Sequence, residues 1–157
     1  MNKSIYLDFS RCIYCRSCEI ACEREHNGYS WIWVVQPDER HSIPINCRHC
    51  EKAPCAAVCS TQAITRTSEG VVTIEAMKCT GCQLCVVACP FGVLQLDIVS
   101  RIVRKCDLCQ GRLNEGKVPA CVATCPAQAL IYDNFEAIMQ KKREEAAAAF
   151  VKRWVRE

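Results

Sequence analysis

The sequence predicts a small α+β fold in which short strands and single helical turns surround groups of cysteines, followed by an amphipathic C-terminal helix. Three observations predict it. The 157-residue chain contains sixteen cysteines. Short apolar runs and turn residues alternate beside those cysteines. Apolar residues recur at intervals of three and four in residues 134–157, which indicates a helix with one apolar face.

The cysteines fall into four groups of four, and none is left over. The first and third groups have the spacing C-x2-C-x2-C-x3-C, the second C-x2-C-x4-C-x3-C and the fourth C-x2-C-x11-C-x3-C. In chain order the groups are Cys12, Cys15, Cys18 and Cys22; Cys47, Cys50, Cys55 and Cys59; Cys79, Cys82, Cys85 and Cys89; and Cys106, Cys109, Cys121 and Cys125.

This spacing is typical of [4Fe–4S] clusters. Three cysteines at intervals of three on one loop can each reach a different iron of a cube, and the fourth can ligate a neighbouring cluster. Structural zinc favours two C-x2-C pairs separated by a longer span, and disulfides belong to oxidising compartments. Because the close spacing occurs twice and every cysteine is used, we expect four [4Fe–4S] clusters with all sixteen cysteines as iron ligands.

Apolar runs on both sides of the groups predict the strands. Strands are expected before three of the groups, in SIYLDF, VVTIEA and IVSRIVR. After the fourth cysteine of three groups, STQAITR, PFGVLQL and PAQALIY predict one turn of helix and then a strand. Pro90 and Pro126 would occupy the first turn of such helices, and Ser60 would cap one.

Strand, cluster loop, short helix and strand is the unit of a small ferredoxin, so four units predict two ferredoxin-like modules. The spacing leaves their pairing open. Groups one with two and three with four would make a tandem duplication, whereas one with four and two with three would nest one module inside the other.

Two segments lie outside this repeat. In residues 23–46, Trp31–Val35 is an apolar centre and Pro37–Arg40 is expected to be a turn. This segment is either a hairpin that packs over the first cluster or a docking surface. Residues 134–157 are expected to form a helix capped by Asn134, which covers the protein's own core or contacts a partner or another copy. Its expected apolar stripe consists of Phe135, Ile138, Met139, Ala146, Ala149, Phe150 and Trp154.

The remaining polar residues do not predict a catalytic site. His26, His41 and His49 do not form a ligand cluster in the sequence, and we expect them in loops or at the surface. Tyr14 and His49 lie within cluster loops, where they could hydrogen-bond to a cluster or shield it. No nucleotide-binding fingerprint and no Ser/His/Asp set is present, so we expect no catalytic residues.

The net charge bears on possible binding partners, and the N-terminal residues bear on the cellular location. The formal net charge of +3 counts every thiol as neutral; four clusters of about −2 each would change it to about −5. The basic residues therefore do not indicate nucleic-acid binding. The first residues do not resemble a secretory signal, and no apolar run is long enough to span a bilayer. We expect a cytoplasmic protein without direct membrane insertion, although export with a signal-bearing partner is compatible with the sequence.

The second and fourth groups carry a family resemblance. CRHCEKAPCAAVCSTQAI and KCDLCQGRLNEGKVPACVATCPAQAL resemble the second and fourth motifs of the sixteen-cysteine iron–sulfur subunits of the dimethyl-sulfoxide-reductase family, including the irregular x4 and x11 spacings. That group also includes the small subunits of formate dehydrogenases, the ferredoxin-like protein of carbon monoxide dehydrogenase and the electron-transfer subunit of tungsten aldehyde oxidoreductases. The resemblance covers most of the sequence.

The resemblance implies the nested pairing. An inner module of about residues 43–100 would lie within an outer module of residues 1–42 and 101–133, and the helix 134–157 would follow this iron–sulfur domain of residues 1–133. The implied ligand sets are Cys12, Cys15, Cys18 and Cys125; Cys22, Cys106, Cys109 and Cys121; Cys47, Cys50, Cys55 and Cys89; and Cys59, Cys79, Cys82 and Cys85.

Clusters of this kind, without any other site, predict an electron relay. The expected partner is a catalytic oxidoreductase subunit with a tungsten or molybdenum pterin, such as an aldehyde oxidoreductase of anaerobic metabolism. A flavin-containing subunit and other copies of the same protein are further candidate partners. The alternatives are the electron-transfer subunit of a carbon monoxide dehydrogenase, hydrogenase or formate dehydrogenase, and a freely diffusing polyferredoxin.

Overall fold

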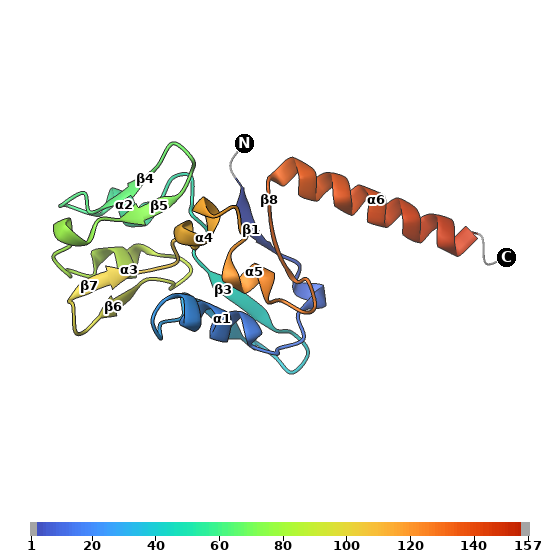
Figure 1. The fold of residues 1–157 in the computed structure, drawn as a ribbon, viewed down its shortest axis with the longest axis horizontal. Coiled ribbons are helices and arrows are strands. Elements are labelled where there is room, and N and C mark those ends of the chain that lie inside the picture. The colour runs from blue at the N-terminus through green and yellow to red at the C-terminus, as the bar shows by residue number, and fades with distance from the viewer. Residues whose placement is uncertain (1–2, 155–157) are drawn as a thin grey trace.

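A computed structural model describes residues 3–154 (Figure 1). The strands in this range form four two-stranded antiparallel sheets, and each sheet is too small to be stable alone in water. The sheets pair β1 (Ser4–Leu7) with β8 (Leu130–Asp133), β2 (Ile32–Val35) with β3 (Ile43–Asn46), β4 (Ile64–Arg66) with β5 (Val72–Ile74), and β6 (Gln95–Asp97) with β7 (Ile102–Arg104).

Short helices accompany the sheets, and all but one of the α-helices have nine residues or fewer. Two 3-10 turns, Phe9–Arg11 and Ala76–Lys78, directly precede the first cysteine of groups one and three. The α-helices are α1 (Ser17–Glu25), α2 (Pro54–Ala57), α3 (Leu84–Ala88), α4 (Gln110–Asn114), α5 (Ala120–Ala123) and α6 (Phe135–Trp154).

The chain folds into two halves that lie side by side (Figure 1). In one half the first strand meets the last, with Ser4 opposite Asp133 and Leu7 opposite Leu130, and α1 packs against α5. In the other half α2 packs against α3 beside β4, β5, β6 and β7. The N-terminal strand is thus completed by a segment more than a hundred residues later in the sequence.

The predicted strands lie where the apolar runs placed them, with one exception. In IVSRIVR only the second half is a strand, β7, because residues 98–101 form the turn of the β6–β7 hairpin. In that turn Asp97 accepts hydrogen bonds from the backbone N–H groups of Val99 and Ser100. A carboxylate that holds the following two or three N–H groups favours a turn over a continued strand.

The predicted helices after the fourth cysteines are wrong. Instead, a helix begins one residue before the third cysteine of each group, in α1, α2, α3 and α5. In group three, α3 ends at Ala88, and Cys89 follows in extended backbone before Pro90. A residue before proline is disfavoured in a helix, so Pro90 and Pro126 help to end these helices rather than begin new ones. Ser60 lies in a turn and caps no helix.

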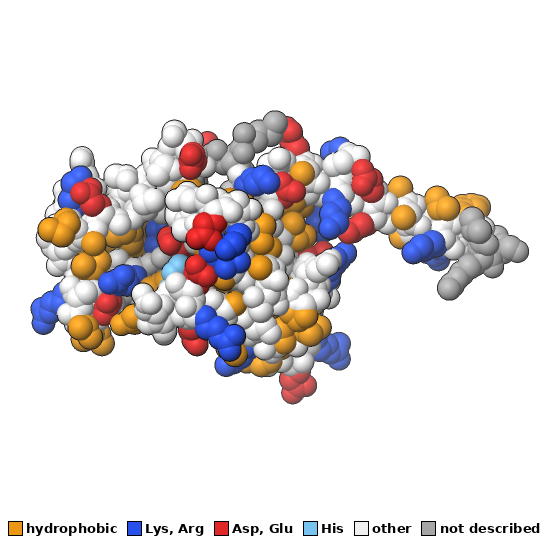
Figure 2. Space-filling model, viewed as in Figure 1, with side chains coloured by type: hydrophobic (Ala, Val, Ile, Leu, Met, Phe, Trp, Pro, Cys, Tyr) orange, Lys and Arg blue, Asp and Glu red, His pale blue; other side chains and the backbone are white. Residues whose placement is uncertain are grey.

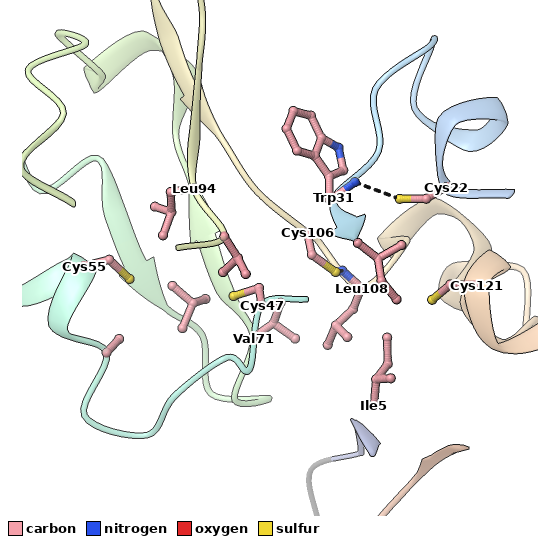
Figure 3. Packing of buried hydrophobic residues seen from close by; sticks show 14 of the residues in the cluster. Ile5, Cys22, Trp31, Cys47, Cys55, Val71, Leu94, Cys106, Leu108 and Cys121 are labelled. Carbon is pink, nitrogen blue, oxygen red and sulfur yellow. Dashed lines mark hydrogen bonds between the residues drawn. The ribbon is translucent and has the colours of Figure 1, made fainter. Parts of the chain in front are cut away.

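Cysteines form a large part of the core, which runs through both halves of the molecule. Figure 3 shows Cys22, Cys47, Cys55, Cys106 and Cys121 among apolar side chains such as Ile5, Leu94 and Leu108. The most deeply buried large side chains include Ile32, Val72 and Val103, one from each of three different sheets.

The segment after α1 forms the expected hairpin, β2–β3, and its turn contains Pro37–Arg40. Trp31 is only 6% exposed and stacks on Tyr29, with ring centroids 5.7 Å apart. Trp31 itself is therefore not available to a partner, whereas Tyr29 and Val35 of the same segment are exposed.

The C-terminal helix begins as predicted, with the Asn134 side chain accepting a hydrogen bond of 2.8 Å from the N–H of Ala137. Its contacts with the body lie in the part up to Glu145. There Ile138 is buried, and Arg11 forms an ion pair of 3.2 Å with Glu145. Beyond this point the helix projects from the body (Figure 1), and Phe150 and Trp154 are exposed. The apolar stripe is thus covered at one end only, and residues 155–157 of the predicted helix lie outside the described residues.

Candidate metal centres

A repeated backbone conformation shapes the four cysteine loops. The residue before the second cysteine of each group lies in the left-handed region: Tyr14 (φ 57°), His49 (φ 45°), Gly81 (φ 68°) and Leu108 (φ 60°). Alternation of right- and left-handed residues turns successive N–H groups to one side and forms a concave site for anions, including iron–sulfur clusters. The internal repeat seen weakly in the sequence is therefore clear in the backbone.

Only one of these four positions needs glycine. Tyr, His and Leu adopt a positive φ at the equivalent positions, so the conformation alone does not require it. A Cβ on Gly81 would lie 2.5 Å from the carbonyl oxygen of Arg101, in the turn of the β6–β7 hairpin. The requirement comes from this close approach of two backbone segments.

We expect Gly81→Ala to destabilise the loop of group three by about 1–3 kcal/mol, the usual cost of overpacking, and to reduce the iron content. Thermal unfolding and iron analysis of the anaerobically purified variant measure both effects. The matched control is Gly92→Ala, because Gly92 also has a positive φ (62°) but has no atom near its Cβ position. Equal losses in the two variants would mean that φ, and not the contact with Arg101, requires glycine.

Cysteines of group one and group four meet at one cavity. Its lining includes Cys12, Cys15, Cys18 and Cys125, and the β2–β3 hairpin closes one side with Val34 and Pro44. Burial raises the pKa of Cys18 to about 12, and the nearby Cys125 thiolate contributes to that rise. The hairpin therefore packs over the cysteines of group one, as one of the two sequence interpretations expected.

A second set of cysteines is wholly buried, consisting of Cys22, Cys106, Cys109 and Cys121. Burial raises the pKa of Cys121, and the thiolates of Cys109 and Cys22 raise it further. Hydrogen-bond donors surround these sulfurs: the Trp31 N–H lies 3.2 Å from the Cys22 Sγ (Figure 3) and the Leu108 N–H lies 3.4 Å from the Cys106 Sγ. Such donors stabilise thiolates and tune the metal that they bind.

The other half of the molecule holds the remaining cysteines. Burial raises the pKa of Cys55, and the thiolates of Cys47 and Cys89 add to the rise. Burial also raises the pKa of Cys85 to about 11, with contributions from Cys55, Cys59 and Cys79. Cys50 is half-buried and Cys82 is exposed in the loops between these residues.

The donor set fits iron–sulfur clusters. All sixteen cysteines are free of disulfide bonds, so each thiolate is available to bind iron. Buried thiolates without a cation are costly, and the raised pKa values of Cys18 and Cys85 express that cost. The Nε2 of His49 is a buried nitrogen without a hydrogen-bond partner among the described residues, in the loop between Cys47 and Cys50. Cluster sulfides are acceptors that such a donor needs.

The sequence did not reveal the surroundings of three polar residues at these sites. His49 lies in the cluster loop where the sequence placed it, but it is only 6% exposed there, and its Nδ1 accepts a hydrogen bond from the N–H of Val72 in β5. His26 lies at the end of α1, with its Nε2 3.7 Å from the Cys109 Sγ and 3.6 Å from Asp107. Lys105 is buried beside Cys106. No local pattern marks these residues, since each depends on a partner distant in sequence.

The other singled-out residues have structural roles. Tyr14 carries the Arg16 guanidinium over its ring, and its hydroxyl accepts a hydrogen bond from the same side chain. Between Cys109 and Cys121, the chain forms α4 and the turn that follows it. None of the helices in residues 3–154 combines the length and apolar character needed to cross a membrane.

The sequence matches a family of known domains. Residues 39–135 match the family described as 4Fe-4S dicluster domain. The match covers groups two, three and four, while group one lies before it.

Curated proteins are similar over most of the sequence. The thiosulfate reductase electron transfer subunit PhsB of Salmonella typhi is 37% identical over 82% of this protein and 74% of PhsB. The B subunit of the anaerobic dimethyl sulfoxide reductase of Escherichia coli (strain K12) is 32% identical over 92% of this protein and 79% of that subunit. UacF of the same strain, named as an oxidoreductase, is 38% identical over 95% of this protein, which spans only 24% of UacF.

Proposed function

Because this protein belongs to the 4Fe-4S dicluster family, we propose that it is the electron-transfer component of an oxidoreductase complex and not itself a catalyst. It carries four [4Fe–4S] clusters on its sixteen cysteines. Such clusters accept and release single electrons, at potentials set by hydrogen bonds to sulfur, burial and nearby charge. The protein's own residues hold the clusters, exclude water from them and orient them toward one another.

We propose the nested ligand sets. The cavity lined by Cys12, Cys15, Cys18 and Cys125 supports the first set. The pairing of β1 with β8 and the packing of α1 on α5 support an outer module of residues 1–42 and 101–133. The packing of α2 on α3 supports an inner module of about residues 43–100. Sheet pairing crosses both of its bounds, since β7 at Ile102–Arg104 pairs with β6 and β3 at Ile43–Asn46 pairs with β2.

The proposed order of the clusters along the wire is linear. The set with Cys12 lies next to the set with Cys22, then comes the set with Cys47, and finally the set with Cys79. Charge interactions across the three junctions support this order. Burial is the largest cause of the raised pKa in each case, but a thiolate of the neighbouring set adds to it: Cys18 acts on Cys121, Cys47 on Cys106 and Cys55 on Cys85.

The observation that best supports an electron relay is the solvent exposure of the cysteines, because it differs between the terminal and the central sets. Cys15 and Cys82, from the two terminal sets, are the exposed cysteines. The second set, by contrast, is wholly buried. In the third set two cysteines are buried and two are half-buried. Electrons would therefore enter at one terminal cluster and leave at the other, and the second cluster is the one best shielded from solvent.

Exposed apolar side chains surround both ends. Ile13 lines the same cavity as Cys15, and Phe9 lies in the 3-10 turn that precedes Cys12. Leu84, Val87 and Phe91 lie on or beside α3, which begins two residues after Cys82. Hydrophobic side chains are visible at the α3 end of the body in Figure 2. Apolar surface beside a redox centre suits contact with a partner protein, which would bring its own redox group close to the terminal cluster.

For the partner we propose a catalytic subunit with a tungsten or molybdenum pterin, such as an aldehyde oxidoreductase. The names of PhsB and of the dimethyl sulfoxide reductase B subunit support a reductase complex in general. The exposed apolar ends and the projecting half of α6 favour a complex over a freely diffusing polyferredoxin. A carbon monoxide dehydrogenase, hydrogenase or formate dehydrogenase is the alternative partner, and a flavin-containing subunit or further copies of this protein would receive or supply the electrons.

Anaerobic purification of the native protein tests this proposal. We expect about 16 Fe per chain, as four cubanes require, and a co-purifying catalytic subunit that contains tungsten or molybdenum. Nickel in the partner would point instead to a hydrogenase or carbon monoxide dehydrogenase. A monomer that carries four clusters but passes electrons to no catalytic partner would contradict the complex, and substantial zinc or much less iron would contradict the clusters.

A further inference from the structure

A buried lysine lies between the two halves of the molecule. Lys105 is only 6% exposed, and its ammonium donates hydrogen bonds to the carbonyl oxygens of Val72 and Cys106. Within residues 3–154 it forms no ion pair with a carboxylate. A buried lysine normally has an acidic partner, so the compensating negative charge for Lys105 has to come from elsewhere.

The same residue, Val72, links Lys105 to His49. The carbonyl of Val72 accepts from Lys105, while its N–H donates to the Nδ1 of His49 at 3.0 Å. Because Nδ1 is an acceptor, the neutral imidazole carries its hydrogen on Nε2, and this Nε2–H has no partner among the described residues. Lys105, Val72 and His49 thus form a buried polar bridge with a positive charge at one end and a free donor at the other.

The bridge lies between the two central sets of cysteines. Lys105 directly precedes Cys106, and His49 lies in the loop between Cys47 and Cys50. The Lys105 ammonium donates to the carbonyl of Cys106, which belongs to the second set, and to Val72, whose N–H in turn binds His49 in the loop of the third set. Its charge therefore lies beside cysteine loops of both halves of the molecule.

We propose that Lys105 and His49 set the potentials of the two central clusters, Lys105 as a positive charge shared by both and His49 as a hydrogen-bond donor to the cluster of the Cys47 loop. This inference rests on the proposed relay. Reduction adds a negative charge to a cluster that is already about −2. A buried cation and an N–H donor both stabilise the reduced form more than the oxidised form, and so raise the potential.

The consequence concerns electron transfer between the two halves. An electron that crosses the molecule has to pass through the two central clusters. A shared cation raises both potentials together, which eases reduction of the buried middle of the wire without creating a large step between neighbours. Lys105 is placed for this because it follows β7 directly and reaches Val72 in β5, which belongs to a different hairpin.

The test is an EPR-monitored redox titration of the full-length protein with its clusters. In Lys105→Met we expect two of the four midpoint potentials to shift to more negative values, while the other two stay. The variants Cys15→Ser and Cys82→Ser each remove one terminal cluster. The midpoint potentials that disappear in these variants belong to the terminal clusters and should be the two that do not shift in Lys105→Met. Lys105→Arg keeps the charge and is expected to keep the potentials close to those of the wild type.

The sequence offers a matched control. Lys78 also directly precedes the first cysteine of a group, but it is exposed and pairs with Glu75 at 2.6 Å. Solvent and Glu75 already screen its charge, so Lys78→Met should leave all four potentials unchanged. Similar shifts in Lys78→Met and Lys105→Met would overturn the special role of the buried charge.

Two variants of His49 separate the donor from the structural contact. Asparagine can keep an acceptor near the place of Nδ1 for the Val72 N–H but has no group at the place of Nε2, whereas glutamine can place an amide N–H there. We expect His49→Asn to shift one central potential to more negative values and His49→Gln to preserve it. The reverse pattern would show that His49 only supports β5.

The outcomes separate this inference from the relay itself. Four reducible clusters in every variant with unchanged potentials would overturn the inference and leave the relay intact. Fewer than four reducible clusters in the wild type would contradict the relay first. If Lys105→Met does not assemble its clusters, Lys105→Gln, which is neutral but can still donate to a carbonyl, takes its place, and unchanged potentials in that variant overturn the inference.

Discussion

Replacing Cys125 and Cys15 together by serine is expected to remove no more iron than replacing Cys15 alone, about four Fe for one cubane. The reason is that both side chains line one cavity, with Cys12 and Cys18, although they are 110 positions apart in the sequence. Once the first substitution has removed the cluster, the second substitution at the same site has no further iron to remove. Iron analysis and the count of reducible clusters measure the effect.

The control for this prediction is the pair Cys15→Ser and Cys109→Ser. Cys109 belongs to the same sequence group as Cys125 but lies among the wholly buried cysteines of the second set. This pair should remove about eight Fe, because two cubanes of four irons each are affected. If instead Cys15 with Cys125 costs two clusters, the nested pairing is wrong and a tandem arrangement remains.

Removing the iron is expected to abolish the cooperative unfolding transition of the body, a loss of roughly 10 kcal/mol or more by analogy with structural metal sites. The sheets have only two strands each, and many of the buried apolar residues are cysteines whose packing depends on the clusters. Two-stranded sheets are not stable without such support. Anaerobic chelation followed by near- and far-UV circular dichroism and thermal unfolding measures the effect.

Any helical signal that remains after chelation is expected to come from the projecting half of α6. The projecting half of α6 does not contact the body, so its helical signal does not report on the core. A variant that ends at Glu145 removes this signal and should keep all its iron, since the contacts of Ile138 and the Arg11–Glu145 ion pair remain. An iron-free protein that retains native near-UV signals and unfolds cooperatively would contradict a cluster-dependent fold.

Local patterns in the sequence were sufficient for the features that depend on near neighbours. The C-x2-C spacings predicted the cofactors because adjacent cysteines on one loop can reach one cube. Asn134 predicted the start of α6 because a cap acts within three residues. The proline after the third group was misread, since the same local preference suits a helix start and a helix end, and α3 ends there.

The cysteine spacing alone thus determined that this is an iron–sulfur protein with four clusters. Only the tertiary structure decided that Cys18 and Cys125 lie together, that Trp31 and His49 are buried, and that Lys105 has no acidic partner among the described residues. These properties arise between β1 and β8, between the loop of His49 and β5, and between Lys105 and Val72. Spacing along the sequence does not encode such contacts, because they form only when distant segments pack around a common core.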